Sequence, residues 1–465
     1  MILAIDLGST NFKAAAFTAE LERLGGASVA TPYHHRDGER VEMNAADVRR
    51  ETLALIQSAC RDAGCRTTDL GTIAITSQAQ NVVVLDGAGR ARTHVTSWLD
   101  TRATREAEAL MADFGEDWHT HASMGSLSAQ MQLSHLLWFH RHQPESLEGD
   151  IRIVSLPGLI FHLLAGVNLT DDNLAAMSGC YSLKQRDWRA DILERCGVDV
   201  SALPRIVPVG SHVQIKSRCS ELALANEIDL VAAGNDQTAG AYGNGCGNAQ
   251  VVVTLGTALV AYQFAGQTIG PYHTGCFWGP YPGGGYYELA VDSEGCLALD
   301  WARETLAPGQ TLKAFDEVVA RSRAGVTKQM GFFYPSQMRS SHAWQGAFKN
   351  AEEKAYAVLE GLTFALRRLL EEEFEWGRKK ALRVIGGGSH SMVWLQLIAD
   401  ALDCEVVQGS GDSLLGAAAM AAGCAAPQGH GPRFSPDANQ HQRLDARWLR
   451  WREWFVINKR PYANT

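Results

Sequence analysis

The chain has 465 residues, 46% of them hydrophobic, which is more apolar material than a single domain usually buries. Its net charge of −9, without a cluster of lysine and arginine interleaved with aromatic residues, makes it a poor nucleic-acid binder. The most apolar long stretch, 414–426, is too short to span a bilayer, so we expect no membrane contact.

The cysteines and the first residues predict the compartment. The ten cysteines form no C-x-x-C pair and have no regular spacing, which favours reduced, mostly buried thiols. Residues 1–5 lead directly into the first motif without a basic segment, so we expect no signal peptide. A cytoplasmic protein is the resulting prediction.

The first half of the chain alternates short apolar runs with helical patterns. Asn44 precedes the first helical pattern and is a good candidate for its N-cap. Strands are predicted over 1–6, 12–17, 71–76, 82–86, 151–154 and 227–233, and helices over 44–60, 101–111, 129–142, 156–164 and 237–242.

The same order restarts after the glycine-rich segment 243–247. Strands are predicted over 251–255, 258–264, 382–385 and 406–407, and helices over 352–374, 390–402 and 413–422. Trp448, Trp451 and Trp454 follow at helical spacing, and we interpret them as core or interface residues rather than a binding stripe.

Two segments about 250 residues apart have the same shape. Ala4–Ser9 and Val252–Thr257 each run from a buried strand into a Leu-Gly-hydroxyl turn. This repeat predicts an α/β protein of two homologous domains, 1–245 and 246–465. The first copy carries Asp6 where the second has Thr254, so only the first can hold a metal ion at that place.

The first copy is a candidate phosphate site. A turn at Gly8 exposes backbone N–H groups, Ser9 and Thr10 add hydroxyl donors, and Lys13 adds a positive charge. Asp6 could bind Mg²⁺ directly or through water. An ordinary hairpin turn explains the segment equally well.

Two further glycine turns are weaker signals. Gly256 and Thr257 repeat the phosphate turn without its acid, and alone they favour a simple turn. Residues 386–388 are three glycines after a strand and before a helix, where a flat adenine ring could approach the backbone. A tight strand-to-helix turn is the alternative, and G-x-x-x-x-G-K-[ST] occurs nowhere in the chain.

Asp236 follows a buried strand and precedes a helix. A carboxylate there can accept the proton of an attacking hydroxyl, which makes it a candidate general base. A helix N-cap is the competing interpretation and is favoured when the residue is taken alone.

A separate segment suits a sugar or polyol. Trp98 offers an apolar face, and Asp100, Gln78 and Gln80 offer hydrogen-bonding groups. A structural tryptophan with Asp100 as a helix cap is an equally good explanation.

These motifs, in this order, resemble the FGGY family of carbohydrate kinases, in the actin/Hsp70/sugar-kinase superfamily, over about residues 1–425. The first phosphate motif, the Gln78 and Trp98-x-Asp100-x-Arg102 segment, the residues around Asp236, and the second phosphate motif each have a counterpart there. Residues 386–396, with 399–400, follow the family's adenosine motif.

The resemblance implies two ribonuclease H-like, actin-like ATPase domains around a central cleft. It also implies ATP and Mg²⁺ as cofactors and a small-molecule sugar as substrate, and it suggests a homodimer. Asp236 is then the catalytic base, with Asp6 and Asp236 at the metal ion. The implied ATP-binding residues are Gly8, Ser9, Thr10, Asn11, Lys13, Gly256, Thr257, Gly387, Gly388 and Met392. The implied substrate-binding residues are Gln78, Gln80, Trp98, Asp100, Asp236 and Gln237.

The resemblance is least specific for the substrate. Ala79 and Gln80 stand where glycerol kinases carry Arg-Glu and xylulokinases carry Met-His. We expect a ketose such as a pentulose. The alternatives are a kinase for another polyol such as glycerol, a non-catalytic sugar or nucleotide sensor, and an Hsp70-like ATPase.

Overall fold

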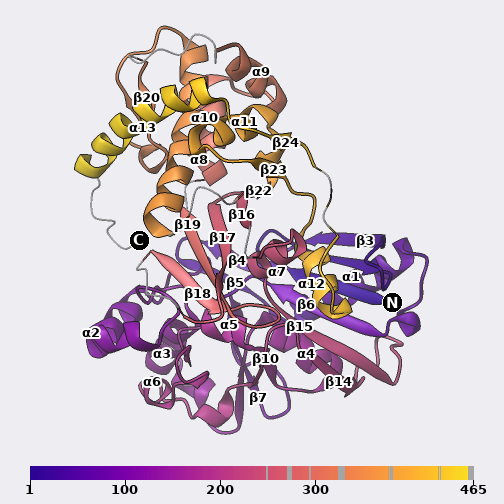
Figure 1. Ribbon diagram of the computed structural model, residues 1–465. Coiled ribbons are helices and arrows are strands. Elements are labelled where there is room, and N and C mark those ends of the chain that lie inside the picture. The colour runs from indigo at the N-terminus through magenta and orange to yellow at the C-terminus, as the bar shows by residue number, and fades with distance from the viewer. Residues whose placement is uncertain are drawn as a thin grey trace. The chain divides into compact units, whose positions relative to one another are not determined.

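The computed structural model describes residues 1–247, 250–269, 275–292, 295–322, 330–374, 376, 381–427, 429 and 431–458. The chain forms two compact units, whose elements are labelled in Figure 1. Unit 1 comprises 1–245, 264–288 and 411–427, and unit 2 comprises 246–263, 289–410 and 428–465. A domain boundary near residue 245 stays a prediction, since unit 1 also takes in two later segments.

Unit 1 is built on a six-stranded sheet in the order β14–β15–β6–β1–β2–β3. The central strand β1 runs antiparallel to β2 and parallel to β6, which in turn pairs with β15 in parallel. The strands are β1 (Ile2–Leu7), β2 (Asn11–Phe17), β3 (Arg23–Ala30), β6 (Thr72–Ser77), β14 (His212–Lys216) and β15 (Glu227–Asn235).

Both faces of this sheet are covered, because successive apolar side chains of its strands point to opposite sides. Leu3, Ile5 and Ile73 pack with α1 (Ala45–Asp62) and α4 (Leu156–Ala165). Ile2, Ala4 and Ala74 pack instead with α7 (Asp236–Gly243) and α12 (Ser413–Ala422). Asn44 caps α1 as predicted, its Oδ1 accepting from the Ala46 N–H at 2.8 Å.

The rest of unit 1 consists of shorter strands and helices that lie between or after these strands in the sequence. Its strands are β4 (Tyr33–Asp37), β5 (Arg40–Met43), β7 (Val83–Asp86), β8 (Val95–Thr96), β9 (Ile151–Val154), β10 (Leu169–Asp171), β11 (Tyr181–Ser182), β12 (Asp187–Trp188), β13 (Arg205–Val207) and β18 (Cys276–Pro280). Its helices are α2 (Thr104–His121), α3 (Gln132–His142), α5 (Asp172–Ala176) and α6 (Ala190–Glu194).

Unit 2 repeats the plan of unit 1, with strands in the order β19–β17–β16–β22–β23–β24. Here β16 is antiparallel to β17 and parallel to β22, as β1 is to β2 and β6. The strands are β16 (Gln250–Leu255), β17 (Leu259–Gly266), β19 (Tyr286–Asp292), β22 (Ala381–Ile385), β23 (Val406–Gln408) and β24 (Arg433–Phe434). The predicted α/β class with two homologous domains is confirmed.

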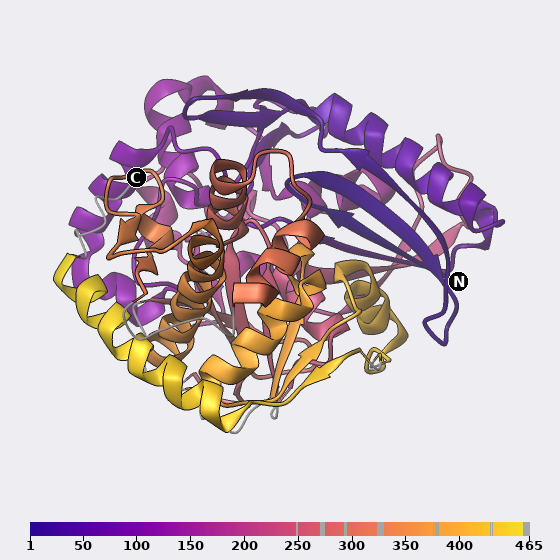
Figure 2. The same cartoon turned by 90° about the horizontal axis from the view of Figure 1, so that it is seen from above.

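Helices and a short hairpin complete unit 2. They are α8 (Gly295–Leu306), α9 (Leu312–Ser322), α10 (Ala351–Arg368), α11 (Met392–Leu402), α13 (Ala438–Asn458), β20 (Phe332–Phe333) and β21 (Trp344–Gln345). Figure 2 shows α13 along the outside of α10 and α11. Its Trp448 and Trp451 are buried there, which confirms the core interpretation for these two.

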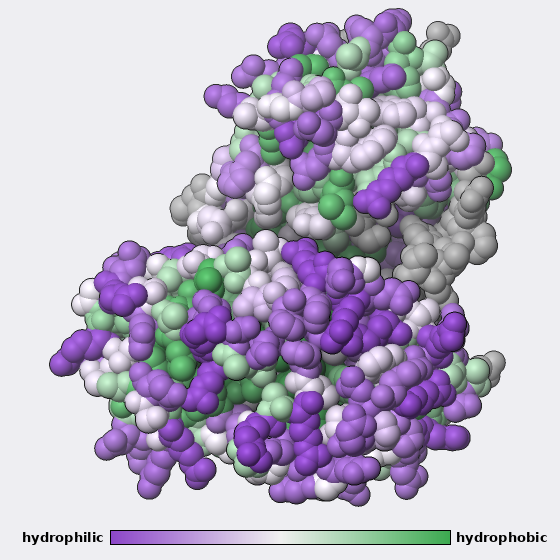
Figure 3. Space-filling view, turned by 180° about the vertical axis from the view of Figure 1, so that it is seen from behind, coloured by the Kyte–Doolittle hydropathy of each residue, from purple (hydrophilic) through white to green (hydrophobic). Residues whose placement is uncertain are grey.

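Hydrophilic side chains cover most of the face of unit 1 seen in Figure 3. In the part of the chain that the structure describes, no helix is both long and apolar enough to cross a bilayer.

Candidate active site

The first phosphate motif is the turn between β1 and β2. Asp6, the last residue but one of β1, lies directly opposite Lys13 in the antiparallel register, so both side chains lie on the α7/α12 face of the sheet. The turn is fixed by side chains from outside it: Thr31 Oγ1 donates to the Gly8 carbonyl at 2.8 Å, and the Tyr33 hydroxyl donates to the Ser9 carbonyl at 2.9 Å. Its backbone is therefore held in place before any ligand arrives.

Asp6 is a buried carboxylate with spare bonding capacity. Its Oδ2 accepts the Ser413 hydroxyl from the first residue of α12 at 2.6 Å. Its Oδ1 is buried and has no hydrogen-bond partner among the described residues. Burial raises the pKa of Asp6, and the Ser413 hydrogen bond and the Lys13 ammonium offset part of that rise. Such an atom is ready to bind a cation or a water molecule.

Asp236 is the first residue of α7, and its carboxylate is not the cap of that helix. The N-cap is Asn235, whose Oδ1 accepts from the Thr238 N–H at 2.9 Å. The interpretation of Asp236 as a helix cap is therefore wrong. Desolvation raises the pKa of Asp236, and the nearby negative charge of Asp6 raises it further. The negative charge of Asp6 therefore acts on Asp236, as expected of two carboxylates that share a cation or a proton.

A buried asparagine that the sequence did not single out holds this corner. The Asn173 side chain, on α5, accepts from the Asn235 backbone N–H at 3.0 Å and from its side-chain amide at 2.7 Å. It donates to Thr238 Oγ1 at 3.0 Å and to the Pro280 carbonyl at 2.9 Å. Asn173 therefore fixes the strand end and the first helical turn that carry Asp236.

The two aspartates before Asn173 are also strongly perturbed. Burial raises the pKa of Asp171 to about 7, although its carboxylate accepts from the backbone N–H groups of Leu174 and Gly234. Burial raises the pKa of Asp172 to about 6. Perturbed carboxyl groups of this kind cluster at functional sites.

These buried acids predict a pH-dependent stability. The pKa of Asp171 rises from 3.8 to about 7 on folding, so the folded chain binds more protons than the unfolded chain between these values. The free energy of unfolding should then fall as pH rises through that window, by up to about 1.4 kcal/mol per pH unit for each such group. We expect Asp171→Asn to flatten this slope in urea unfolding between pH 5 and 7.

A matched control is the exposed Asp199. Hydrogen bonds from Ser201 lower its pKa, so it is ionised throughout the measured range. Asp199→Asn should leave the slope unchanged, and equal slopes for the wild type and Asp171→Asn would contradict the assignment.

The predicted substrate side lies next to the phosphate turn. Gln78 is buried; its Oε1 accepts from the Ser97 hydroxyl at 3.1 Å, and its Nε2 lies 3.5 Å from the Gly8 carbonyl. Gln80 has a left-handed backbone (φ 63°) and lines a small pocket with Gln132, Thr170 and Ser178, among others. Trp98 is 39% exposed.

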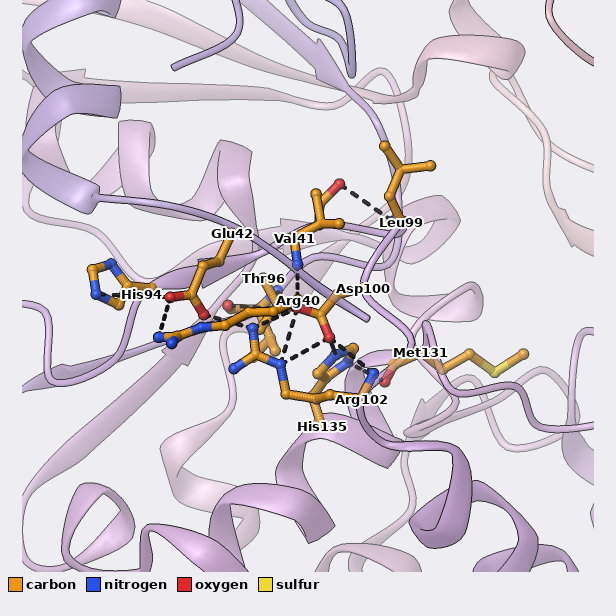
Figure 4. Close-up of polar contacts among 12 residues, drawn as sticks. Arg40, Val41, Glu42, His94, Thr96, Leu99, Asp100, Arg102, Met131 and His135 are labelled. Carbon is orange, nitrogen blue, oxygen red and sulfur yellow. Dashed lines mark hydrogen bonds and ion pairs between the residues drawn. The ribbon is translucent and has the colours of Figure 1, made fainter. Parts of the chain in front are cut away.

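Asp100 has a different environment from the other predicted substrate residues. It is fully buried and accepts from the Val41 N–H at 2.8 Å, from Arg102 Nε at 2.9 Å, and bonds His135 Nε2 at 3.2 Å (Figure 4). Burial works to raise the pKa of Asp100, but the hydrogen bonds from His135 and Arg102 outweigh it and hold the pKa well below its usual range. With both oxygens engaged, Asp100 supports the fold, and the cap of α2 is Ala103 rather than Asp100.

The remaining predicted nucleotide residues are in unit 2. The turn between β16 and β17, 256–258, has the same length as the turn 8–10, with Thr254 at the place of Asp6. Gly386 has φ 88°, and a Cβ there would meet the Leu255 carbonyl at 2.6 Å, so only glycine fits. A Cβ on Gly387 would meet no atom within 4 Å, and Met392, the first residue of α11, is 40% exposed.

Known proteins resemble this chain in sequence and in fold. The chain matches the models of the FGGY family of carbohydrate kinases, the N-terminal domain over residues 1–243 and the C-terminal domain over 274–425. The chain belongs to the FGGY family of carbohydrate kinases. This carbohydrate kinase is therefore an enzyme that phosphorylates a sugar.

Relatives and a solved structure agree with the family. The kinase is 23% identical over 448 residues to the xylulose kinase of Bacillus subtilis, covering 90% of this chain and 87% of that one. It is 26% identical over 447 residues to the L-fuculokinase of Escherichia coli, covering 87% and 88%. The ligand-bound xylulose kinase structure from Lactobacillus acidophilus has the same fold, with a TM-score of 0.88, 17% identity and 99% of each chain covered.

Sequence reasoning missed several residues of this corner. Asp171, Asp172 and Asn173 lie in a segment with no recognised motif. The only available signal was the pair of adjacent acidic residues in this segment. Ser413 starts a helix that was predicted correctly, but its bond to Asp6 joins positions 407 residues apart.

Proposed function

We propose that this enzyme transfers the γ-phosphoryl group of ATP to a hydroxyl of a ketose, with Asp236 as the general base. The observation that carries the proposal is the pair of carboxylates formed by the buried Asp6 and the half-buried Asp236, each of which has a raised pKa. A base with a pKa near neutrality suits proton removal from an attacking hydroxyl.

Each residue has a role in this proposal. Asp236 accepts the proton, and Gln237, Gln78, Gln80 and Trp98 orient the sugar. The phosphate-binding groups proposed on the two hairpins are Gly8, Ser9, Thr10, Asn11, Lys13, Gly256 and Thr257. The adenosine is proposed to lie against Gly387, Gly388 and Met392. Asp100 is left out, because its carboxylate is occupied.

The residues fit a magnesium ion. Asp6 Oδ1 is buried without a partner among the described residues, and a cation would relieve the repulsion from Asp6 that raises the pKa of Asp236. No group of three or more metal-binding side chains occurs in the described ranges. This suits Mg²⁺, which usually binds one or two carboxylates together with water and substrate phosphates. When bound it would neutralise charge on the phosphates.

A ketose is the best-supported substrate class. The two relatives named above act on xylulose and fuculose, which are both ketoses. Ala79 and Gln80 stand where glycerol kinases carry the charged pair Arg-Glu, and the lack of that pair counts against glycerol as the substrate. Action in the cytoplasm and assembly as a homodimer stay predictions.

The test is ADP release with Mg²⁺-ATP across ketoses, aldoses, glycerol and other polyols, with Asp236→Ala as the control. One strong substrate whose turnover is abolished by the substitution would support the proposal and name the sugar. ATP binding without turnover on any of them would favour a non-catalytic sensor. Peptide-stimulated ATPase activity without a sugar would favour an Hsp70-like role.

The adenosine site gives a sharper prediction at Gly387. A Cβ there enters open space, so Gly387→Val should leave the melting temperature unchanged while raising KM for ATP by roughly tenfold, through collision with the nucleotide. Initial rates at varied ATP with saturating sugar measure this. The matched variant is Gly71→Val, where an added Cβ would meet only the Met1 carbonyl at 3.9 Å, and it should leave KM for ATP unchanged. An unchanged KM in Gly387→Val would remove this segment from the nucleotide site.

A further inference from the structure

A cavity of about 660 Å³ lies in unit 1 on residues that the proposed reaction does not use. Strand β5, the start of α1, the loop 89–94 and α4 contribute to its wall. The described lining residues include five arginines and two histidines but one carboxylate, Glu42. The arginines are Arg40, Arg49, Arg90, Arg92 and Arg102, and the histidines are His94 and His162.

The single carboxylate is shared among several cationic groups. Glu42 contacts Arg40 and Arg102 at 2.6 Å each and His94 at 3.8 Å, as Figure 4 shows. Arg102 also pairs with the buried Asp100. Arg49 and Arg90 pair with Glu221 and Asp86, which do not line the cavity. The wall itself therefore presents far more positive than negative charge.

Two further lining residues have donors or acceptors to spare. Arg92 donates to the main-chain carbonyls of Glu145 and Glu148, and within the described ranges it contacts no carboxylate. His162 Nδ1 is buried and has no hydrogen-bond partner there. Burial lowers the pKa of His162, and the positive charges of Arg152 and Arg218 lower it further. Arg92 and His162 are therefore available to a ligand in the cavity.

The backbone adds to this potential. Asn44, Ala45 and Ala46 line the cavity, and they form the N-terminus of the 18-residue helix α1. The N-terminal end of a long helix carries a partial positive charge and favours anions. A volume of this size is typical of small-molecule sites.

We propose that this cavity binds a small phosphorylated sugar, at a site separate from the Asp236 corner. Guanidinium groups match phosphate oxygens in a bidentate manner, and the exposed Arg40 and Arg49 can turn toward a ligand because each is about half exposed. A phosphate group would also give Arg92, which contacts only main-chain carbonyls within the described ranges, an anionic partner that a neutral sugar cannot provide. The proposal goes beyond the phosphorylation reaction and does not depend on which sugar the enzyme phosphorylates.

A chain of hydrogen bonds leads from the cavity to the substrate side. Arg102 bonds Asp100, the Asp100 N–H donates to the Ser97 carbonyl at 3.0 Å, and the Ser97 hydroxyl donates to Gln78. A ligand that draws Arg102 toward the cavity would act on this chain. We therefore expect occupancy to change KM for the sugar substrate.

Calorimetric titration with glucose 6-phosphate, and with pyrophosphate in the absence of Mg²⁺, tests the site directly. Glucose is the uncharged control ligand. We expect glucose 6-phosphate or pyrophosphate to bind, glucose not to bind, and Arg40→Gln/Arg49→Gln to weaken binding at least tenfold. The matched variant is Arg66→Gln, a more exposed arginine outside the cavity, which should leave affinity unchanged.

A fourth variant separates the cavity from the proposed phosphate turn. Lys13→Gln should leave binding unchanged if the anion occupies the cavity. Loss of binding in Lys13→Gln but not in Arg40→Gln/Arg49→Gln would overturn the proposal, as would the absence of binding of both anions to the wild type. Thermal melts of every variant confirm that a lost signal is not lost folding.

Discussion

Asp236→Asn is expected to lower kcat by about 10²- to 10⁴-fold while ATP still binds, because the amide cannot accept the proton of the attacking hydroxyl. The substitution keeps the size of the side chain, and Asn235 remains the cap of α7, so the fold should be retained. Initial rates with the best sugar from the substrate screen measure kcat, and ATP affinity is measured by equilibrium titration.

The control for this variant lies near the start of β15, the strand that leads into Asp236. Asp229 is on β15, which ends one residue before Asp236, and its carboxylate pairs with His212. Asp229→Asn makes the same chemical change far from the phosphate turn and should leave kcat within about twofold. Full turnover in Asp236→Asn would refute the role of Asp236 as a base.

The pH profile adds a second readout for the same residue. Since burial and Asp6 raise the pKa of Asp236 to about 7, the ionised base is lost as pH falls through that value. We expect kcat/KM to decline on the acid side of neutrality in the wild type. In Asp236→Asn this decline should disappear from whatever residual activity remains.

Asn173→Ala is expected to destabilise the enzyme and to lower kcat. The side chain makes four hydrogen bonds in a fully buried position, and truncation leaves several buried groups without partners. Each buried group left unsatisfied costs about 1–3 kcal/mol of unfolding free energy. Because Asn235 and Thr238 lose their anchor, Asp236 should also be less well positioned.

Two measurements separate positioning from stability in this variant. Urea unfolding gives the loss of stability, and initial rates well below the unfolding transition should show a lower kcat with KM for ATP unchanged. Asn168→Ala is a suitable control, because the buried Asn168 Oδ1 has no partner among the described residues. Wild-type stability and kcat in Asn173→Ala would contradict the role of Asn173.

Sequence alone predicted the repeated part of the fold well. The two Leu-Gly turns identified the duplication, and the short strands and the helix 413–422 lie where the apolar periodicity placed them. These features depend on local patterns, which a single sequence contains. The long helix predicted over 352–374 is instead α10 followed by a short π-helix, 369–373, which periodicity alone cannot distinguish.

The site was predicted less completely, because its contacts join distant segments. Asp100 is of a residue type that often binds sugar hydroxyls, yet its partners Arg102 and His135 make it a buried structural ion. Asn173 gave no local signal, although it fixes the turn that carries Asp236. Whether a polar side chain remains available to a ligand depends on its partners from distant parts of the chain, which a single sequence does not reveal.

The return of the segment 411–427 to unit 1 has a consequence for biosynthesis. Helix α12 covers one face of the first sheet, and its Ser413 donates a hydrogen bond to Asp6. This helix nevertheless follows most of unit 2 in the chain. At typical elongation rates, this helix leaves the ribosome about 10 to 30 s after residue 245. Until then only α7 covers that apolar face of the nascent sheet, and a fragment ending at residue 245 would keep the part that packs against α12 exposed permanently.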